Sequence, residues 1–430
     1  MNTSYLLERA WVGDRVEDDV LVEISHGRFT RVDVRAAAEG APRLSGLTIP
    51  GLANCHSHAF HRALRGRTQR GRGTFWTWRE QMYDAAGRLD PDSYFLLARA
   101  TYREMVAAGY TSVGEFHYLH HQPDGTPYDD PNAMGHALMA AAREAGLRIC
   151  LLDTCYLSSG FGRPVEGVQR RFSDGSVDSW SDRMVQLRPA DGVSVGGAFH
   201  SVRAVPREEL RSYTAALLHI HLSEQPAENE ECLATYGVTP ARLLHEAGNH
   251  LGPSVTVVHA THLTDDDVEL LGTTGTNVCI TPTTERDLAD GIGPAARLAA
   301  AGCRITLGSD SHAVIDPFEE MRGLELDERL ATQERGHWTS AQLLGAATGH
   351  GTLGFGDAGA IAVGQRADLV TLDTTSPRTA GTGADEQTAA YAASAADVVQ
   401  VVADGRVVFT RGDEVAIGRE LERAVSAVWR

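Results

Sequence analysis

The sequence predicts a TIM barrel, a (β/α)8 fold of the α/β class, with a small β-sandwich domain built from both chain ends. Apolar strands alternate with helices over residues 47–355 of the 430, and this length and rhythm are typical of such a barrel. Strand patterns also occupy residues 1–46 and 356–430. The simplest arrangement joins these two ends into one domain that flanks the barrel. An open, doubly wound sheet is the alternative fold.

The N-terminal segment contains short strands, for example Val20–Ile24 and Phe29–Val34, with turns at Gly27 and Gly40. Several strands beyond residue 47 are near-continuous apolar runs, which is typical of parallel strands that are buried on both faces. The predicted barrel strands are Leu47–Asn54, Thr111–Glu115, Ile149–Cys155, Val193–Phe199, Leu217–His221, Val255–His259, Asn277–Ile280 and Arg304–Gly308.

Helices are predicted between these strands. The pair Asp90-Pro91 begins a helix that Gly109 ends, and a similar pattern at Asp130 begins a helix that Gly146 ends.

The C-terminal segment returns to strand patterns. Strands are predicted at Ala367–Leu372, Val398–Val402 and Val407–Thr410, the last two joined by a turn at Asp404. Between them, Thr374–Ala396 is rich in Ala, Thr, Gly and Ser, so we expect a surface excursion or a linker there.

Composition and charge exclude several classes of protein. The chain has 39 basic and 57 acidic residues, and its net charge of −18 argues against a nucleic-acid partner or an anionic membrane. It has no signal-type N-terminus and no run of about 18 apolar residues, which argues against membrane insertion. A soluble, cytoplasmic protein is expected, and we expect it to form a homodimer. The six cysteines lack CxxC spacing, so a thiolate zinc site is not indicated.

Every basic residue of this chain is arginine, because the sequence contains no lysine. Schiff-base chemistry and a P-loop phosphate site both need a lysine and are therefore excluded. A two-metal site bridged by a modified lysine is excluded for the same reason.

Polar clusters follow four of the predicted barrel strands, at the end where TIM barrels place their catalytic groups. His56 and His58 share one side of the first strand because they are two residues apart. His221 ends the fifth strand, His259 ends the sixth and Asp310 follows the eighth. Each cluster alone has an ordinary explanation, such as a polar strand end, a histidine at the barrel rim or a helix cap.

Taken together, these clusters predict a metal site. His56, His58, His221 and Asp310 offer three nitrogens and one oxygen, which leaves an open position for water on a borderline metal such as zinc. Glu224, three residues after His221, is positioned to move a proton, although it could simply begin the next helix. Asp310 could also accept the proton of the water, and His259 could polarise or orient a substrate.

These residues, in this order, resemble the mononuclear deaminase branch of the amidohydrolase superfamily. The resemblance begins at Pro50-Gly51-Leu52, which leads into the His56-Ser57-His58 motif, and the absence of lysine agrees with it. Longer strings, over essentially the full chain, are similar to the formimidoylglutamate deiminases of histidine degradation. These strings are Phe75–Glu80, Glu115–His121, Phe199–Ala204 and Val258–His262.

The resemblance implies one zinc ion per chain, or iron or another divalent ion in its place, bound by the four ligands above. Glu224, His259 and Asp310 would be catalytic. The pocket would hold a small dicarboxylate, and its implied binding residues are His61, Arg79, Tyr118, His200 and Arg203. His61 stands where the family carries a glutamine that contacts the substrate. The implied reaction is hydrolysis of N-formimino-L-glutamate to N-formyl-L-glutamate and ammonia, and planar guanidinium groups suit the two carboxylates of that substrate.

Other functions remain open at this point. The chain could deaminate a heterocycle or open the ring of imidazolonepropionate, or it could be a metal-binding scaffold without catalysis. A second metal at His117, His120 and His121 is disfavoured, since four ligands for one metal are already present.

Overall fold

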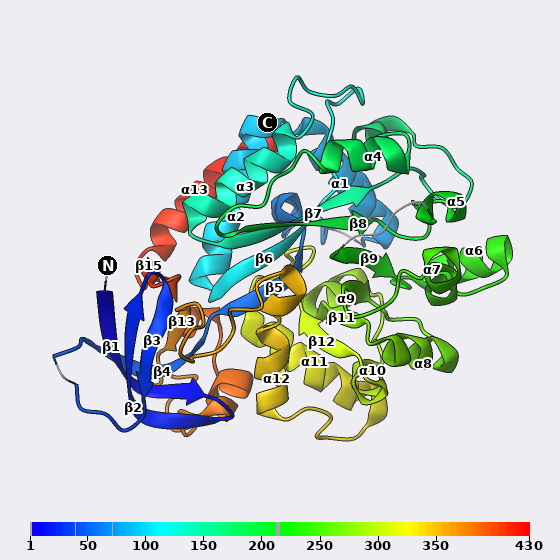
Figure 1. Cartoon of the computed structure of the whole chain (residues 1–430). Coiled ribbons are helices and arrows are strands. Elements are labelled where there is room, and N and C mark those ends of the chain that lie inside the picture. The colour runs from blue at the N-terminus through cyan, green and yellow to red at the C-terminus, as the bar shows by residue number, and fades with distance from the viewer. Residues whose placement is uncertain (1, 39, 71, 212–215) are drawn as a thin grey trace.

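The computed structural model describes residues 2–38, 40–70, 72–211 and 216–430 (Figure 1). Its larger sheet has eight parallel strands, and strands that follow one another in the chain are neighbours in the sheet. These strands are β5 (Leu52–Ser57), β6 (Tyr110–His117), β7 (Arg148–Cys155), β8 (Val193–Phe199), β9 (Leu218–Leu222), β10 (Val255–His259), β11 (Asn277–Ile280) and β12 (Arg304–Leu307).

Hydrogen bonds between the ends of the first and last strands close this sheet into a barrel. The backbone N–H of Asp310 donates to the carbonyl of His56 at 3.0 Å, and the N–H of His58 donates to the carbonyl of Asp310 at 3.2 Å. The predicted TIM barrel is confirmed, and the doubly wound alternative is wrong.

Helices surround the parallel strands (Figure 1). No helix among the described residues is long and apolar enough to cross a bilayer. The helices are α1 (Phe75–Arg88), α2 (Pro91–Ala107), α3 (Ala133–Ala145), α4 (Val177–Met184), α5 (Arg207–Leu210), α6 (Pro226–Tyr236), α7 (Pro240–Gly248), α8 (Asp265–Thr274), α9 (Pro282–Leu288), α10 (Ala295–Ala301), α11 (Pro317–Thr332), α12 (Ser340–Ala347) and α13 (Glu414–Val428).

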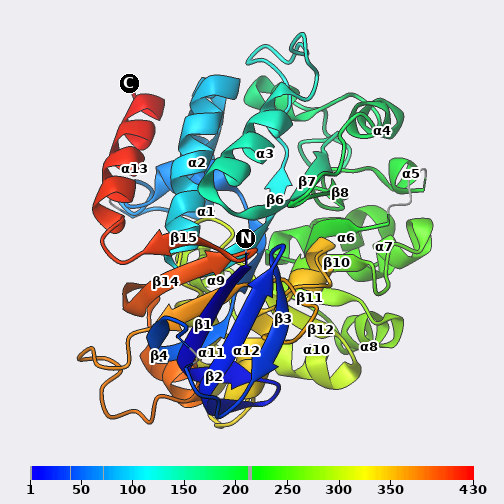
Figure 2. The ribbon, with the colours of Figure 1, turned by 60° about the vertical axis from the view of Figure 1, so that its left-hand side comes forward.

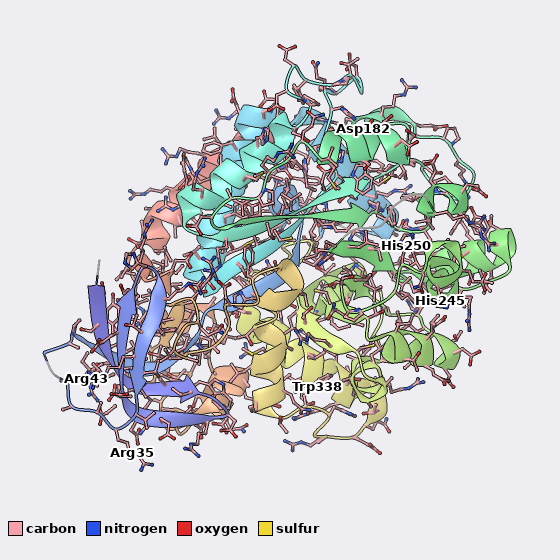
Figure 3. All side chains as sticks on the ribbon, in the orientation of Figure 1. Arg35, Arg43, Asp182, His245, His250 and Trp338 are labelled. Carbon is pink, nitrogen blue, oxygen red and sulfur yellow. The ribbon has the colours of Figure 1, made fainter. Side chains whose placement is uncertain are left out.

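The helix ends follow the local sequence. Asp90 caps α2 by accepting the backbone N–H of Ser93, as expected, and Gly146 ends α3 with a φ of 76°. The predicted start of α3 at Asp130 is wrong by two residues, since Asn132 is its N-cap. The Asp130 carboxylate accepts the N–H of Asn132 at 2.9 Å, which forms a turn before the helix begins. Figure 3 shows Trp338 before α12, where its indole N–H donates to Glu328 of α11 at 2.7 Å.

The second sheet combines strands from both chain ends, as predicted, and lies beside the barrel (Figure 2). Its seven strands pair in the order β15-β14-β13-β4-β1-β2-β3. They are β1 (Asn2–Val12), β2 (Arg15–Ser25), β3 (Arg28–Asp33), β4 (Arg43–Pro50), β13 (Leu369–Leu372), β14 (Val398–Ala403) and β15 (Arg406–Thr410). This sheet has a small core of its own, which includes Leu7, Val22 and Phe29.

The strand predicted at Leu47–Asn54 is two strands in the structure. β4 ends at Pro50 in the mixed sheet and β5 begins at Leu52 in the barrel. Gly51 lies between the two strands. A Cβ atom added at this residue would lie 2.3 Å from Thr111 Oγ1, which is too close for any other residue without a shift of the backbone. The single apolar run therefore serves both sheets, and only glycine fits at the crossing.

Two C-terminal features differ from the predictions. Part of the expected excursion at Thr374–Ala396 is packed rather than exposed, because it contains a π-helix, Thr388–Ala392, whose first three residues are buried. Helix α13 was not predicted, and Figure 2 shows it beside α2. The indole of Trp429, just after α13, donates to the carbonyl of Ala63 at 2.9 Å, so this helix supports the segment that follows β5.

Candidate active site

The structure brings the four predicted metal ligands together at the C-terminal end of the barrel. His56 and His221 lie within β5 and β9, and His58 and Asp310 lie just beyond β5 and β12. Their ligand atoms lie within 4.8 Å of one another, and all four residues are buried. The four side chains come from three separate strand ends, as the sequence indicated.

The distances between these atoms suit one metal ion. His56 Nε2 lies 3.2 Å from His58 Nε2 and 3.0 Å from His221 Nε2. Asp310 Oδ1 lies 3.5 Å from His56 Nε2 and 3.3 Å from His58 Nε2. Neighbouring ligand atoms bound about 2.0–2.1 Å from a zinc ion that also keeps a position for water would be about 2.8–3.6 Å apart. The donor set therefore fits a single ion of that size.

Hydrogen bonds on the far side of two imidazole rings fix their tautomers. His58 Nδ1 donates to the carbonyl of Phe116 at 2.9 Å, and His221 Nδ1 donates to the carbonyl of His200 at 2.9 Å. Each neutral ring therefore directs the bare lone pair of Nε2 at the common centre. Burial lowers the pKa of His56 and His221, and burial with the nearby His56 lowers the pKa of His58 to about 3. Neutral rings at pH 7 are what metal binding requires.

Residues behind the ligands, which were not among the predicted site residues, hold the end of β5 to the segment after β12 on one side and to β6 on the other. The Asn54 amide accepts the Ser309 N–H at 2.9 Å and donates to the Ser309 hydroxyl at 2.6 Å. Glu115 accepts the Ser57 hydroxyl at 2.7 Å and the Ala59 N–H at 2.6 Å. Burial raises the pKa of Glu115 to about 8. An acidic residue inside the apolar run of β6 was the available signal for this role.

His259 faces two of the predicted catalytic carboxylates. Its Nε2 lies 3.9 Å from Glu224 Oε1 and 3.8 Å from Asp310 Oδ2. Its Nδ1 lies 3.1 Å from Thr281 Oγ1, and that hydroxyl donates to Glu285. Burial alone would lower the pKa of His259, but Glu224, a hydrogen bond to Glu285 and Asp310 outweigh it and raise the pKa to about 10. Both ring nitrogens can therefore carry protons.

The two oxygens of Asp310 face different groups. Oδ1 points at the histidine ligands and Oδ2 at His259. Burial opposes ionisation, yet a hydrogen bond to His56 and the charges of His56 and His259 hold the pKa of Asp310 well below its usual range. Asp310 is therefore a carboxylate that can bind a metal through one oxygen and accept a proton through the other.

Backbone strain is concentrated where these side chains leave their strands. His259 has a φ of 70°, Asp310 of 41° and Ser223 of 51°, which is the left-handed region that L-residues seldom adopt. Each such residue costs about 1–3 kcal/mol. This cost is consistent with side chains held in position for chemistry.

A cavity opens over the ligand cluster, and all five predicted substrate-binding residues line it: His61, Arg79, Tyr118, His200 and Arg203. His61 Nε2 lies 3.0 Å from the Tyr118 hydroxyl. Arg203 Nε lies 3.9 Å from the buried carboxylate of Glu228. The wall also contains Tyr83 and Tyr156, which the sequence analysis did not name and for which no motif gave a signal.

A second group of possible ligands, His117, His120 and Asp153, lies outside this cavity. Both oxygens of Asp153 accept from Arg183, at 2.8 and 2.9 Å. His120 Nε2 donates to the carbonyl of Thr154 at 2.8 Å. The guanidinium of Arg183 already supplies the positive charge at this place, so the cluster is a structural ion network.

Comparisons with known proteins agree with this site. The family model described as "Amidohydrolase family" matches residues 47–408. Formimidoylglutamate deiminase of Pseudomonas aeruginosa is 37% identical over 399 residues, which cover 88% of this chain and 88% of that protein. The 5'-deoxyadenosine deaminase of Methanothermobacter thermautotrophicus is 28% identical, over 93% of this chain and 89% of that protein.

Solved structures extend the likeness to the whole fold. The amidohydrolase from Brucella melitensis has a TM-score of 0.88 and 30% identity, and covers 100% of both chains. An adenosine deaminase from Xanthomonas campestris with bound zinc has a TM-score of 0.83 and 21% identity over 99% of this chain and 98% of that one, a likeness of fold alone. The chain belongs to the amidohydrolase family, as a metal-dependent hydrolase that acts on carbon–nitrogen bonds.

Proposed function

We propose that the protein is a zinc-dependent deiminase that hydrolyses N-formimino-L-glutamate to N-formyl-L-glutamate and ammonia. The observation that carries the proposal is one cavity in which the metal-ligand cluster and two arginines, Arg79 and Arg203, meet. Guanidinium groups pair bidentately with carboxylates, and this substrate has two of them. The 37% identity to the Pseudomonas deiminase supports the same substrate.

The residues around the metal-ligand cluster divide the work of the reaction. Zinc, when bound by the three histidines and Asp310, would act as a Lewis acid and lower the pKa of a water at the site to about 7. Asp310 Oδ2 accepts a proton from the attacking water. His259 donates a hydrogen bond from Nε2 to the oxygen that the water adds to the tetrahedral carbon. The hydroxyl of Thr281 lies 3.1 Å from Nδ1 of His259 and holds the ring in place. Glu224 carries protons to the imine nitrogen and then to the departing ammonia.

The substrate-binding side chains orient the amidine over that cluster. Arg203, Tyr118 and His200 bind the acidic end of the substrate, so that the formimino carbon lies near Asp310 and Glu224. In this proposal the enzyme works in histidine degradation, as a cytoplasmic homodimer.

A substrate panel tests the proposal. Zinc-loaded protein would be assayed for ammonia release from N-formimino-L-glutamate, guanidino acids and 5'-deoxyadenosine, and for ring opening of imidazolonepropionate. We expect kcat/KM to be highest on formimino-glutamate and to exceed that on 5'-deoxyadenosine, which has no carboxylate, by at least about 30-fold, because pairing a buried charge with a substrate charge is worth about 2–5 kcal/mol. Preference for 5'-deoxyadenosine would overturn the substrate and leave a nucleoside deaminase. No turnover of any compound by zinc-loaded protein would favour a metal-binding scaffold.

A further inference from the structure

A pair of phenols in the cavity wall suggests how the enzyme selects a substrate with two carboxylates. We propose that Tyr83 and Tyr156 together bind the substrate carboxylate that is remote from the formimino group, and that Gln169, which donates to both hydroxyls, directs the remaining phenol hydrogen towards it. This inference rests on the proposed function and assigns a specificity role to three further residues.

The amide of Gln169 determines the direction of the hydrogen bonds. Its Nε2 donates to the Tyr83 hydroxyl oxygen at 2.9 Å and to the Tyr156 hydroxyl oxygen at 3.1 Å. Its Oε1 accepts the backbone N–H of Glu166 at 3.0 Å, which sets which end of the amide faces the phenols. Each phenol oxygen is thus an acceptor towards Gln169, and the two hydroxyls also hydrogen-bond to one another, so that one phenol hydrogen remains to be donated elsewhere.

The pair lies one ring farther from the metal ligands than His200. The Tyr156 ring is 4.9 Å from the ring of His200, which is in turn 5.1 Å from the ring of His221. Among the described residues the Tyr156 ring therefore makes no ring contact with a metal ligand and lies next to His200 instead. This position suits the remote carboxylate rather than the one beside the amidine.

Packing holds both phenols in place. The ring of Phe172 contacts Tyr156 edge-on at 5.5 Å and Tyr83 at 6.2 Å. Phe172 and Gln169 belong to the same short 3-10 helix, Gly167–Phe172, so one element supplies both the ring that packs against the phenols and the amide that binds their hydroxyls. The two hydroxyls are therefore preorganised before a ligand arrives, which reduces the entropy cost of binding.

The charges around the pair favour an anion. The guanidinium of Arg79 lies over the Tyr83 ring at 5.7 Å, and Arg203 lines the same cavity. Burial raises the pKa of Tyr156, so its hydroxyl stays protonated and able to donate. A carboxylate accepts several hydrogen bonds at once, whereas a neutral heterocycle would leave these donors unpaired.

Reversing the polarity of residue 169 gives a direct test. Gln169→Glu keeps the shape but places acceptors towards both phenols, which would draw their hydrogens away from the substrate. Gln169→Met keeps the length and removes the polarity. We expect KM for N-formimino-L-glutamate to rise more in Gln169→Glu than in Gln169→Met, with kcat within about threefold of the parent in both.

Removing the hydroxyls tests the phenols themselves. The double variant Tyr83→Phe/Tyr156→Phe should raise KM for N-formimino-L-glutamate about 10- to 100-fold, because the phenol hydrogen bond to a charged group is lost. The change should be much smaller for the N-formimino derivative of 2-aminobutyrate, which lacks the remote carboxylate. Tyr110→Phe removes a buried hydroxyl outside the cavity and serves as the matched control. Circular dichroism and zinc content would show that each variant folds.

The outcomes separate this inference from the proposed function. Equal changes in KM for both compounds, or none, would overturn the role of the phenols while the deiminase assignment stands. If the parent enzyme releases no ammonia from N-formimino-L-glutamate, the proposed function fails. The phenol pair would then be tested by the rise in Tm that glutarate gives relative to butyrate. That difference is expected in the parent and lost in the double variant, and its absence in the parent would overturn the inference.

Discussion

The metal-binding histidines show how single residues are prepared for their role. His58 and His221 each donate one ring N–H to a backbone carbonyl, so the other nitrogen can only be a lone pair. These two lone pairs, the Nε2 atom of His56 and the Asp310 carboxylate lie within 4.8 Å of one another, and their negative partial charges repel one another unless a cation lies between them. The same logic separates this cluster from the network around Asp153, where Arg183 is already the cation.

Glu224 is the residue whose replacement best separates metal binding from catalysis. Its carboxylate lies 3.9 Å from His259 Nε2 and is not one of the four ligands. Glu224→Gln keeps the shape and removes the proton carrier, so kcat should fall about 10²–10⁴-fold with zinc retained. Steady-state kinetics and elemental analysis of the same sample check this. Activity within a few-fold of the parent would reduce Glu224 to a residue that begins the loop before α6.

Arg203 tests whether the substrate is acidic. Its guanidinium lies in the cavity beside the Glu228 carboxylate, whose oxygens have no hydrogen-bond partner among the described residues. Truncating one partner of a buried charge pair costs about 2–5 kcal/mol, so Arg203→Ala should lose roughly 30- to several-thousand-fold in kcat/KM on N-formimino-L-glutamate. The loss should be far smaller on a formimino compound without carboxylates.

The matched control for this change is Arg207→Ala, since Arg207 pairs with Glu246 outside the cavity. Equal proportional losses on both substrates would mean that Arg203 supports the barrel rim, and the acidic substrate would then be wrong.

At the scale of elements, the sequence predicted what depends on local pattern. The seven barrel strands from β6 to β12 were located to within two residues at each end because their apolar runs are nearly continuous. The boundary at Gly51 was missed because the run continues through it, and only the packing of two sheets reveals the break. Helix α13 was missed although Ile417, Leu421 and Val428 follow helical spacing.

The candidate site divides in the same way. The ligands were predictable because strand ends and residue types agree, whereas Tyr83 lies in α1 after β5, and Tyr156 and Gln169 both lie between β7 and β8. These three side chains are close together only because of the conformations of the connecting segments, which the spacing of residues in the sequence does not predict.

The crossing between the two sheets gives a prediction about stability. In Gly51→Ala, the added Cβ would meet Thr111 Oγ1 at 2.3 Å and Asp368 Cβ at 2.7 Å, so the sheets must shift. Overpacking of this kind costs about 1–3 kcal/mol, and Tm should fall by several degrees. Gly356→Ala is the control, because a Cβ there has nothing within 4 Å. Calorimetry that found the two variants equally stable would show that the crossing is not tightly packed.

At the scale of the whole molecule, the active site lies at the seam of the barrel, the place where the first strand, β5, joins the last strand, β12. Asp310 and His56, more than 250 residues apart, exchange the backbone hydrogen bond that joins β12 to β5. A second buried link, the ion pair of Arg148 with Asp368, ties the barrel to the mixed sheet. A metal held by both His56 and Asp310 would therefore fasten the first barrel strand to the last.

This arrangement predicts that metal content and stability change together. We expect one zinc equivalent per chain, because the described residues offer one set of free ligand atoms and the sequence contains no lysine to bridge a pair. A ligand that binds only the folded state stabilises it by about 2.7 kcal/mol at 100 times its Kd, so removal of the metal by a chelator should lower Tm by several degrees. In Asp310→Asn the Tm should be nearly the same before and after the chelator is added. In His120→Gln, which alters only the structural ion network, the metal should be retained and the fall in Tm on chelation should be the same as in the parent. Elemental analysis that returned two equivalents in active enzyme, or a chelated parent with unchanged Tm, would show that the seam is not fastened by a single ion.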